Sequence, residues 1–128
     1  MNIKNNNMIA FINGVATIQS KKLPIKVGYA ISKNIKIMEP IAVAYDEERK
    51  KILDKYASKD ESGELLVDGD SYVIENQEGY KKEIQELLDI DNEIQIHTIS
   101  FSELEKCDTE KFDALSVQDI SLLEFMME

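Results

Sequence analysis

One stripe of residues between Pro24 and Ala57 constrains this fold more than any other feature of the sequence. Positions alternately three and four residues apart carry Gly28, Ile31, Ile35, Met38, Ala42, Tyr45, Arg49, Ile52 and Tyr56. This spacing places them on one side of an α-helix. Pro24 suits the first turn, because the N–H that it lacks would have no intrahelical partner. The pattern predicts a single helix over residues 24–57, with a stripe about 42 Å long at about 1.5 Å per residue, and a chain that folds to cover that stripe.

Pro40 lies in the interior of this predicted helix. It has no N–H to donate to the carbonyl of Lys36, and its ring crowds the preceding turn. We therefore expect a kink near residues 36–40, or a break into two helices. Ile41 and Val43 lie off the stripe, which leaves two interpretations. Either the second half of the helix is buried on more than one side, or the kink exposes an apolar docking ridge.

The first 23 residues have an ambiguous pattern. Residues 1–7 are polar and are expected to be frayed or only loosely paired. The apolar run 8–12 is typical of a buried strand. Asn13-Gly14 then forms either a tight turn that pairs residues 8–12 with 15–19, or the start of a short helix over residues 14–22 that Asn13 caps. We favour the helix.

The second half of the chain alternates short strands and helices. Residues 64–74 predict a β-hairpin, because Asp68-Gly69 separates two apolar runs. Helical spacing predicts helices over 80–88 and 117–127, and alternation predicts a strand over 93–99. Ser102 and Glu105 have the spacing of a capping box. The sequence therefore predicts an α+β fold, in which the long kinked helix packs against a small antiparallel sheet with further short helices.

The length indicates one domain. A chain of 128 residues buries enough surface to fold without metal or disulfide support. We divide residues 1–128 into an N-terminal strand or helix segment (1–23), the long helix (24–57) and an acidic α+β portion (58–128). The single cysteine, the polar N-terminus and the lack of an apolar run of about 20 residues favour a cytoplasmic protein with no membrane partner.

Charge is distributed unevenly along the chain. Residues 1–57 hold 10 Lys or Arg and 5 Asp or Glu, whereas residues 58–128 hold 5 and 20, so the halves carry +5 and −15. Phosphate groups would be repelled by the acidic half, which argues against direct nucleic-acid binding. Lys22, Lys26 and Lys33 form a short basic stripe. It is either a solvated helix face that attracts the acidic half or a site for an anionic ligand.

Residues that catalysis or metal binding would need are scarce. The chain has one histidine, His97, and one cysteine, Cys107, which cannot complete a zinc site together. Acidic neighbours of Cys107 raise rather than lower a thiol pKa, which disfavours a nucleophile. The acidic residues around Gly63 and Gly69 do not fit the ligand order of a calcium-binding EF-hand loop. The five glycines are isolated, so no phosphate-binding loop is present. We expect no cofactor, no metal and no enzymatic activity.

Several segments carry a resemblance to a known family. They are Leu23-Pro24-Ile25-Lys26-Val27-Gly28-Tyr29-Ala30-Ile31-Ser32-Lys33-Asn34-Ile35-Lys36, Tyr45-Asp46-Glu47-Glu48-Arg49, Tyr56, Leu87-Leu88, Ile94-Gln95-Ile96-His97 and Leu122-Leu123-Glu124-Phe125-Met126. Together they resemble an uncharacterised family of small proteins from tailed phages and prophages of Gram-positive bacteria. This sequence departs from the family at Pro40, where such proteins continue the helix. The resemblance implies a phage-encoded origin and no particular activity.

These observations lead to two main hypotheses. The first is a non-enzymatic accessory protein that binds and inhibits a host factor, such as a defence nuclease, through an acidic surface. The second is a late-module or virion-associated structural or assembly protein of a tailed phage. A weaker third is a small-ligand binder with a pocket lined by the basic half. The expected partner is a host or phage protein with a basic surface, and a homodimer is a further candidate. The expected binding residues are Glu83, Glu86, Asp89, Asp68, Asp70, Ile41 and Val43.

Overall fold

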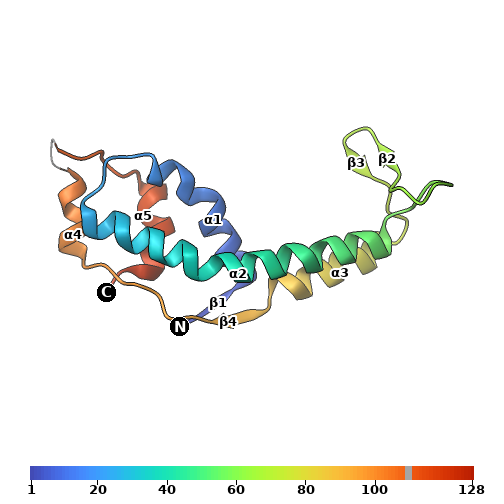
Figure 1. Ribbon diagram of the computed structural model, residues 1–128, viewed down its shortest axis with the longest axis horizontal. Helices are drawn as coiled ribbons and strands as arrows, with labels where there is room; N and C mark the ends of the chain where they lie inside the picture. Colours follow the sequence, from blue (N-terminus) through green and yellow to red (C-terminus); the bar gives the residue numbers. More distant parts are fainter. Residues whose placement is uncertain (109–110) are drawn as a thin grey trace.

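The molecule consists of a helical body and a protruding arm. The computed structural model describes residues 1–108 and 111–128. Figure 1 shows both chain ends in the body, while the second half of α2 and α3 form an arm that ends in a small hairpin. Helices dominate, and the described strands form two antiparallel pairs, β1 with β4 and β2 with β3. The predicted α+β class, with a long helix, small antiparallel sheets and short helices, is therefore confirmed.

Helix α2 spans Ile25–Tyr56 and passes through Pro40 without interruption. Figure 1 shows that its axis changes direction near the middle, so the predicted kink fits and the predicted break is wrong. Its buried residues all precede Pro40: Val27, Ala30, Ile31, Asn34 and Met38. Residues of the stripe are thus fully buried only in its first half. Just after Pro40, Ile41 and Ala42 pack against the edge of the core, and the second half packs mainly on α3. Val43 is 58% exposed, so the second half is not buried on more than one side.

Helix α1 spans Asn5–Gln19. The sequence instead predicts a strand over residues 8–12, followed by a tight turn or by a short helix over residues 14–22. The apolar run 8–12 belongs to this helix, because Met8, Phe11, Val15 and Ile18 recur at helical spacing and are buried. Gly14 marks a close helix contact rather than a turn. A Cβ at this position would lie 2.9 Å from a methyl carbon of Leu122, so glycine lets α1 approach α5.

The N-terminus is ordered, which corrects the expectation that residues 1–7 are frayed. Strand β1 (Asn2–Lys4) pairs antiparallel with β4 (Asp91–Glu93). Asn5 is buried, and its Nδ2 donates to the carbonyl of Leu87 at 2.8 Å. The strand predicted over 93–99 is mostly wrong, because the strand observed here, β4, ends at Glu93. Residues 94–98 are irregular, and Ile99 makes only an isolated bridge to Met127. Strands β2 (Val67–Asp68) and β3 (Ser71–Tyr72) form the predicted hairpin.

The remaining helices lie close to their predicted positions. Helix α3 spans Gln77–Leu88, three residues longer at its start than expected. Helix α4 (Phe101–Glu105) is capped by Ser100 and not by Ser102. Helix α5 (Val117–Leu123) continues into a 3₁₀ turn, η2 (Glu124–Met126), and a second 3₁₀ turn, η1, covers Lys106–Asp108.

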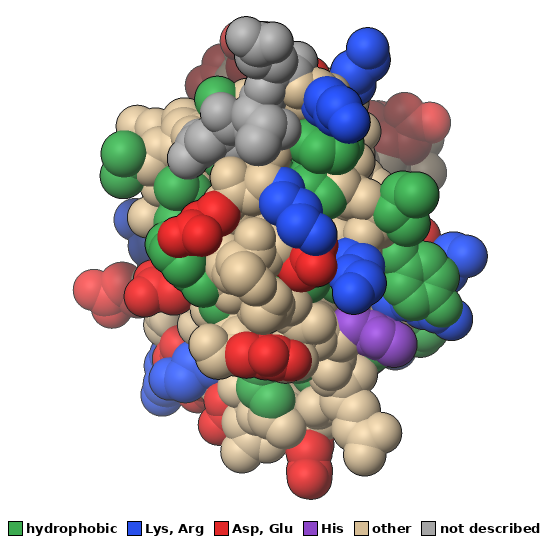
Figure 2. Space-filling view, turned by 90° about the vertical axis from the view of Figure 1, so that its left-hand side faces the viewer, with side chains coloured by type: hydrophobic (Ala, Val, Ile, Leu, Met, Phe, Trp, Pro, Cys, Tyr) green, Lys and Arg blue, Asp and Glu red, His purple; other side chains and the backbone are tan. Residues whose placement is uncertain are grey.

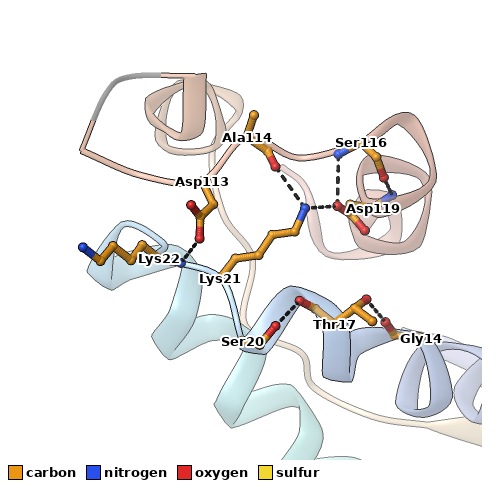
Figure 3. A network of polar contacts seen from close by, with 9 residues as sticks. All are labelled: Gly14, Thr17, Ser20, Lys21, Lys22, Asp113, Ala114, Ser116 and Asp119. Carbon is orange, nitrogen blue, oxygen red and sulfur yellow. Dashed lines mark hydrogen bonds and ion pairs between the residues drawn. The ribbon is translucent and has the colours of Figure 1, made fainter.

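A polar network fastens α5 to the corner between α1 and α2 (Figure 3). The Nζ of Lys21 donates to the carbonyl of Ala114 at 3.0 Å and to Oδ2 of Asp119 at 2.9 Å. Asp119 also completes a capping box with Ser116 at the start of α5. The backbone N–H of Lys22 donates to Asp113 at 2.7 Å. These bonds position α5 so that Leu123 can close the core.

Candidate protein-binding surface

The arm is built from two antiparallel helices. Its outer end holds Tyr56 of α2 against Tyr80 of α3, with ring centroids 6.2 Å apart in an edge-to-face arrangement. Gly79 permits this contact, because a Cβ there would lie 2.9 Å from the Tyr56 ring. The side chain of Asn76 caps α3 by accepting from the N–H of Gly79 at 3.1 Å. The arm therefore holds the hairpin between α2 and α3 away from the body.

The loop before the hairpin is ordered by Asp60. Its Oδ1 accepts from the backbone N–H groups of Ser62 and Glu64, at 2.9 and 3.0 Å, and from the Ser62 hydroxyl at 2.7 Å. The Ser62 hydroxyl, followed by the Glu64 N–H, holds the pKa of the Asp60 carboxyl below its usual value. Gly63, at φ +88°, supplies the left-handed residue of this loop. Asp60 is thus a structural acid and not a free docking charge.

The hairpin presents an apolar pair at its tip. Val67 and Tyr72 lie directly opposite each other in the strand register, which places their side chains on one face. Val67 is 57% exposed and Tyr72 is 47% exposed. The turn between them uses Gly69 at φ +65°, as the Asp68-Gly69 pair predicted. We call the exposed residues Leu66, Val67, Asp68, Asp70 and Tyr72 the tip surface.

Exposed acidic residues are frequent in the segment that carries the tip surface. Residues 60–80 contain seven Asp or Glu and no Lys or Arg. All seven are exposed, and those other than Asp60 are Glu61, Glu64, Asp68, Asp70, Glu75 and Glu78. Exposed apolar side chains next to polar or charged residues are typical of a surface that binds another protein.

The predicted binding residues do not form one surface. Asp68 and Asp70 are exposed at the tip surface, whereas Glu86 and Asp89 are exposed near the other end of α3, next to β4. Those positions are separated by most of a helix of 12 residues, about 18 Å long. The structure therefore divides the predicted acidic site into two clusters.

Glu83 is occupied within the chain. Its Oε1 accepts from Nζ of Lys55 at 3.0 Å, which ties α3 to α2. The Lys55 ammonium, followed by the Tyr56 hydroxyl, lowers the pKa of the Glu83 carboxyl. The two apolar residues predicted to bind a partner differ in exposure: Ile41 is half-buried against the core, while Val43 is exposed. Val43 lines a groove of about 540 Å³ between α1 and α2.

The rare residues His97 and Cys107 lie in separate hollows. His97 packs edge-to-face on Tyr29, with ring centroids 6.1 Å apart, in a hollow of about 360 Å³ that Lys26 and Glu103 also line. Cys107 is buried. Within the described residues, no group of three or more His, Cys, Asp or Glu side chains is placed to hold a metal ion. No helix in the described part of the chain has the length and apolarity to cross a membrane.

Sequence reasoning missed Asn34, which holds the backbone beside His97. Asn34 is fully buried in α2, and its amide forms two hydrogen bonds with the backbone of His97. Nδ2 donates to the His97 carbonyl at 3.0 Å, and Oδ1 accepts from the His97 N–H at 2.7 Å. The only sign of this role in the sequence is that Asn34 stands next to the apolar Ile35 in the predicted helix.

Comparison with known proteins gives no further identification. No protein-family model, no curated protein sequence and no solved structure matches the chain. The tip surface itself is therefore the basis for assigning a function, and the resemblance to phage proteins stays a proposal.

Proposed function

We propose that this chain is a non-catalytic binding protein that docks the tip surface onto a basic surface of a partner protein. The observation that carries the proposal is the exposed Val67–Tyr72 pair at the end of a projecting arm. A large apolar pair left in water costs free energy that a partner can recover by covering it. Its place at the end of the arm gives a partner access without obstruction by the body (Figure 1).

The acidic residues around the pair specify the partner's charge. Asp68 and Asp70 flank the turn, and residues 60–80 hold no basic side chain to neutralise them. Carboxylates at the rim of an interface speed the encounter with a basic partner and repel acidic ones, while the apolar centre slows dissociation. Nucleic acid would be repelled by the same residues.

In its finer form the proposal follows the resemblance to phage proteins. The chain would be encoded by a phage or prophage and would bind and inhibit a host factor in the cytoplasm, with anti-defence activity as one example. The alternative is a late-module or virion-associated assembly protein. A large ring or high oligomer in sedimentation would favour that alternative, whereas a monomer or dimer favours the binding protein.

The test is capture from a host lysate with matched variants. Val67→Ser and Tyr72→Ala should lose a protein that the unmodified chain retains, whereas Val117→Ser, at another exposed valine, should retain it. Asp68→Asn with Asp70→Asn should slow association, and the retained fraction should fall as salt rises from about 0.05 to about 0.5 M. His97→Ala should leave capture unchanged.

Two results would contradict the proposal. Capture that survives the substitutions at Val67 and Tyr72 would place the interface elsewhere. Loss of capture by Glu86→Gln with Asp89→Asn, but not by the tip variants, would move it to the second acidic cluster.

A further inference from the structure

The outer face of α2 is exposed along its whole length. Ile25, Tyr29, Lys36, Val43 and Glu47 recur at helical spacing and all lie in solvent. Ile25 is 88% exposed and Tyr29 is 57% exposed. Helices α1 and α3 pack on other sides of α2. A helix of 32 residues, about 48 Å long, therefore presents one largely exposed face. Near its start this face has partners, since Tyr29 packs on His97 and Lys26 pairs with Glu103 at 3.7 Å.

The centre of this face is apolar. Val43 is exposed there, at the rim of the groove of about 540 Å³. The apolar lining of this groove is formed by the half-buried Ile12, Ile35 and Ala42, and the rest of its lining is charged, with Glu39, Asp46, Glu47 and Lys50. Pro40 lies one turn before Val43 and is exposed. Apolar side chains thus occupy the midpoint of α2.

Charge changes sign across this midpoint. Lys26, Lys33, Pro40, Glu47 and Asp54 follow one another at intervals of seven residues. Residues seven apart lie almost on one line along a helix, because two turns take 7.2 residues. The line is basic before Pro40 and acidic after it. Figure 2, which views the end of the molecule where α2 begins, shows Lys or Arg side chains gathered beside the histidine.

Neighbouring lysines in the second half cancel only part of this acidity. Asp54, the last acid on the line, pairs with Lys59 at 3.1 Å. Lys50 pairs with Asp46 and Lys51 with Glu48, each at 3.0 Å along the helix itself. The charge of Glu47 helps Glu48 to raise the pKa of Lys51, but no side chain in the described ranges forms an ion pair with Glu47. Its carboxylate can therefore still attract a positive charge from outside.

We propose that a second copy of this chain binds the outer face of α2 in antiparallel orientation, with a two-fold axis near Pro40. Lys33 and Glu47 are each seven residues from Pro40, and Lys26 and Asp54 are each fourteen. Antiparallel pairing around Pro40 therefore brings Lys33 of one copy to Glu47 of the other, twice. Parallel pairing would instead set Lys33 against Lys33. A two-fold interface of this kind is closed, so the assembly stops at a dimer.

The dimer is independent of the tip surface. Antiparallel pairing places the two hairpins at opposite ends of the assembly, because each lies beyond the C-terminal end of its own α2. The apolar Val43 and Pro40 would meet near the axis, where residues of the two copies lie closest. Self-association and partner binding can therefore succeed or fail separately.

A charge-swap experiment tests this arrangement. Sedimentation equilibrium should show a concentration-dependent dimer for the unmodified chain. Lys33→Glu and Glu47→Lys should each raise the dimer Kd by about 10-fold or more, because each sets like charges together twice. The double variant should return to within about 3-fold of the unmodified Kd, because it restores opposite charges at both contacts. Val43→Asp should dissociate the dimer, whereas Val117→Asp should not.

The outcomes separate cleanly. A chain that remains monomeric at about 0.5 mM overturns the proposal. A dimer that survives Val43→Asp, with a native circular dichroism spectrum, is formed by another surface. A double charge-swap that stays monomeric while folded excludes this antiparallel register. Capture of a partner through the tip surface would stand in each of these cases.

Discussion

At the scale of single residues, Asn34 connects two parts of the chain that are distant in sequence. It lies on α2 and holds the backbone of His97 through a donor and an acceptor on one amide. Its Nδ2 also lies 3.5 Å from the sulfur of Met126. The Asn34 amide therefore satisfies both the backbone N–H and the backbone C=O of His97, and replaces the hydrogen bonds that a strand would have made there. This explains why residues 94–98 can pass the core without forming the predicted strand.

Replacing Asn34 should therefore cost more than its size indicates. Asn34→Ala removes the hydrogen-bond partners of the His97 N–H and C=O and leaves a cavity. We therefore expect a loss of about 2–4 kcal/mol in the free energy of unfolding. Asn34→Asp should also destabilise, because a carboxylate accepts from the N–H but repels the carbonyl. Urea unfolding gives both values. Asn7→Ala, at an exposed asparagine of α1, is the control, and a loss as small as the control's would contradict this role.

Asp119 gives the network of Figure 3 a pH dependence. The Lys21 ammonium, followed by the Ser116 N–H, lowers the pKa of the Asp119 carboxyl from 3.8. A lowered folded-state pKa means that Asp119 stabilises the fold above its unfolded pKa, and that this contribution is lost as pH falls through the folded pKa. Asp119→Asn should cost about 1 kcal/mol at neutral pH. Denaturation curves against pH should show the difference closing below about pH 4. A constant difference down to about pH 2 would show that the charge is irrelevant.

At the scale of elements, two glycines allow a matched comparison. Gly79 lets α3 meet α2, since a Cβ there would lie 2.7 Å from Nδ2 of Asn76 and 2.9 Å from the Tyr56 ring. A Cβ added at Gly28, in α2, would meet no such neighbour within 4 Å. Gly28→Ala should stabilise by about 0.5–1 kcal/mol through helix propensity. Gly79→Ala should destabilise and raise amide hydrogen exchange in the arm, because the cap or the tyrosine must move. Equal effects of both substitutions would show that the helices are not in close contact.

The elements that could be predicted are those that local spacing defines. Helix α2 has its stripe and its N-terminal proline, and the hairpin has its Asp68-Gly69 turn. Helix α1 was misinterpreted because Asn13-Gly14 resembles a turn, while the real reason for glycine is the distant Leu122. Strand β1 could not be predicted, since its three residues depend on pairing with residues 91–93. Pairing across so long a separation leaves little trace in the local pattern.

At the scale of the whole molecule, the sequence shows which half of the chain is acidic but not how its acidic residues are arranged in space. The charge division between the halves indicated an acidic binding region. It did not show that Asp68 and Asp70 would lie at the end of an arm while Glu86 and Asp89 lie near the body. Nor could it show that Glu83 is held by Lys55. The sequence predicts that Val67 and Tyr72 belong to a β-hairpin but does not predict their exposure, which follows from the separation of the hairpin from the body.

The same separation leads to a prediction about salt. The chain carries a net charge of −10, and residues 60–80, which include the hairpin, hold seven Asp or Glu and no Lys or Arg. Carboxylates concentrated there repel one another in the folded state, and added salt screens this repulsion. The unfolding temperature should therefore rise as NaCl increases from about 0.02 to about 0.5 M. Calorimetry measures this directly.

Matched substitutions on the arm decide whether that repulsion is local. Asp68→Asn with Asp70→Asn should raise the unfolding temperature at low salt and reduce its dependence on salt, since two of the repelling charges are gone. Lys81→Gln with Lys82→Gln, at two exposed lysines of α3, should do the opposite, because the arm loses two positive charges. An unfolding temperature that falls with salt would mean that the ion pairs along α2, such as Lys50 with Asp46, outweigh the repulsion. The acidity of the hairpin would then add little strain to the fold, and only the apolar pair would still indicate that the hairpin binds a partner.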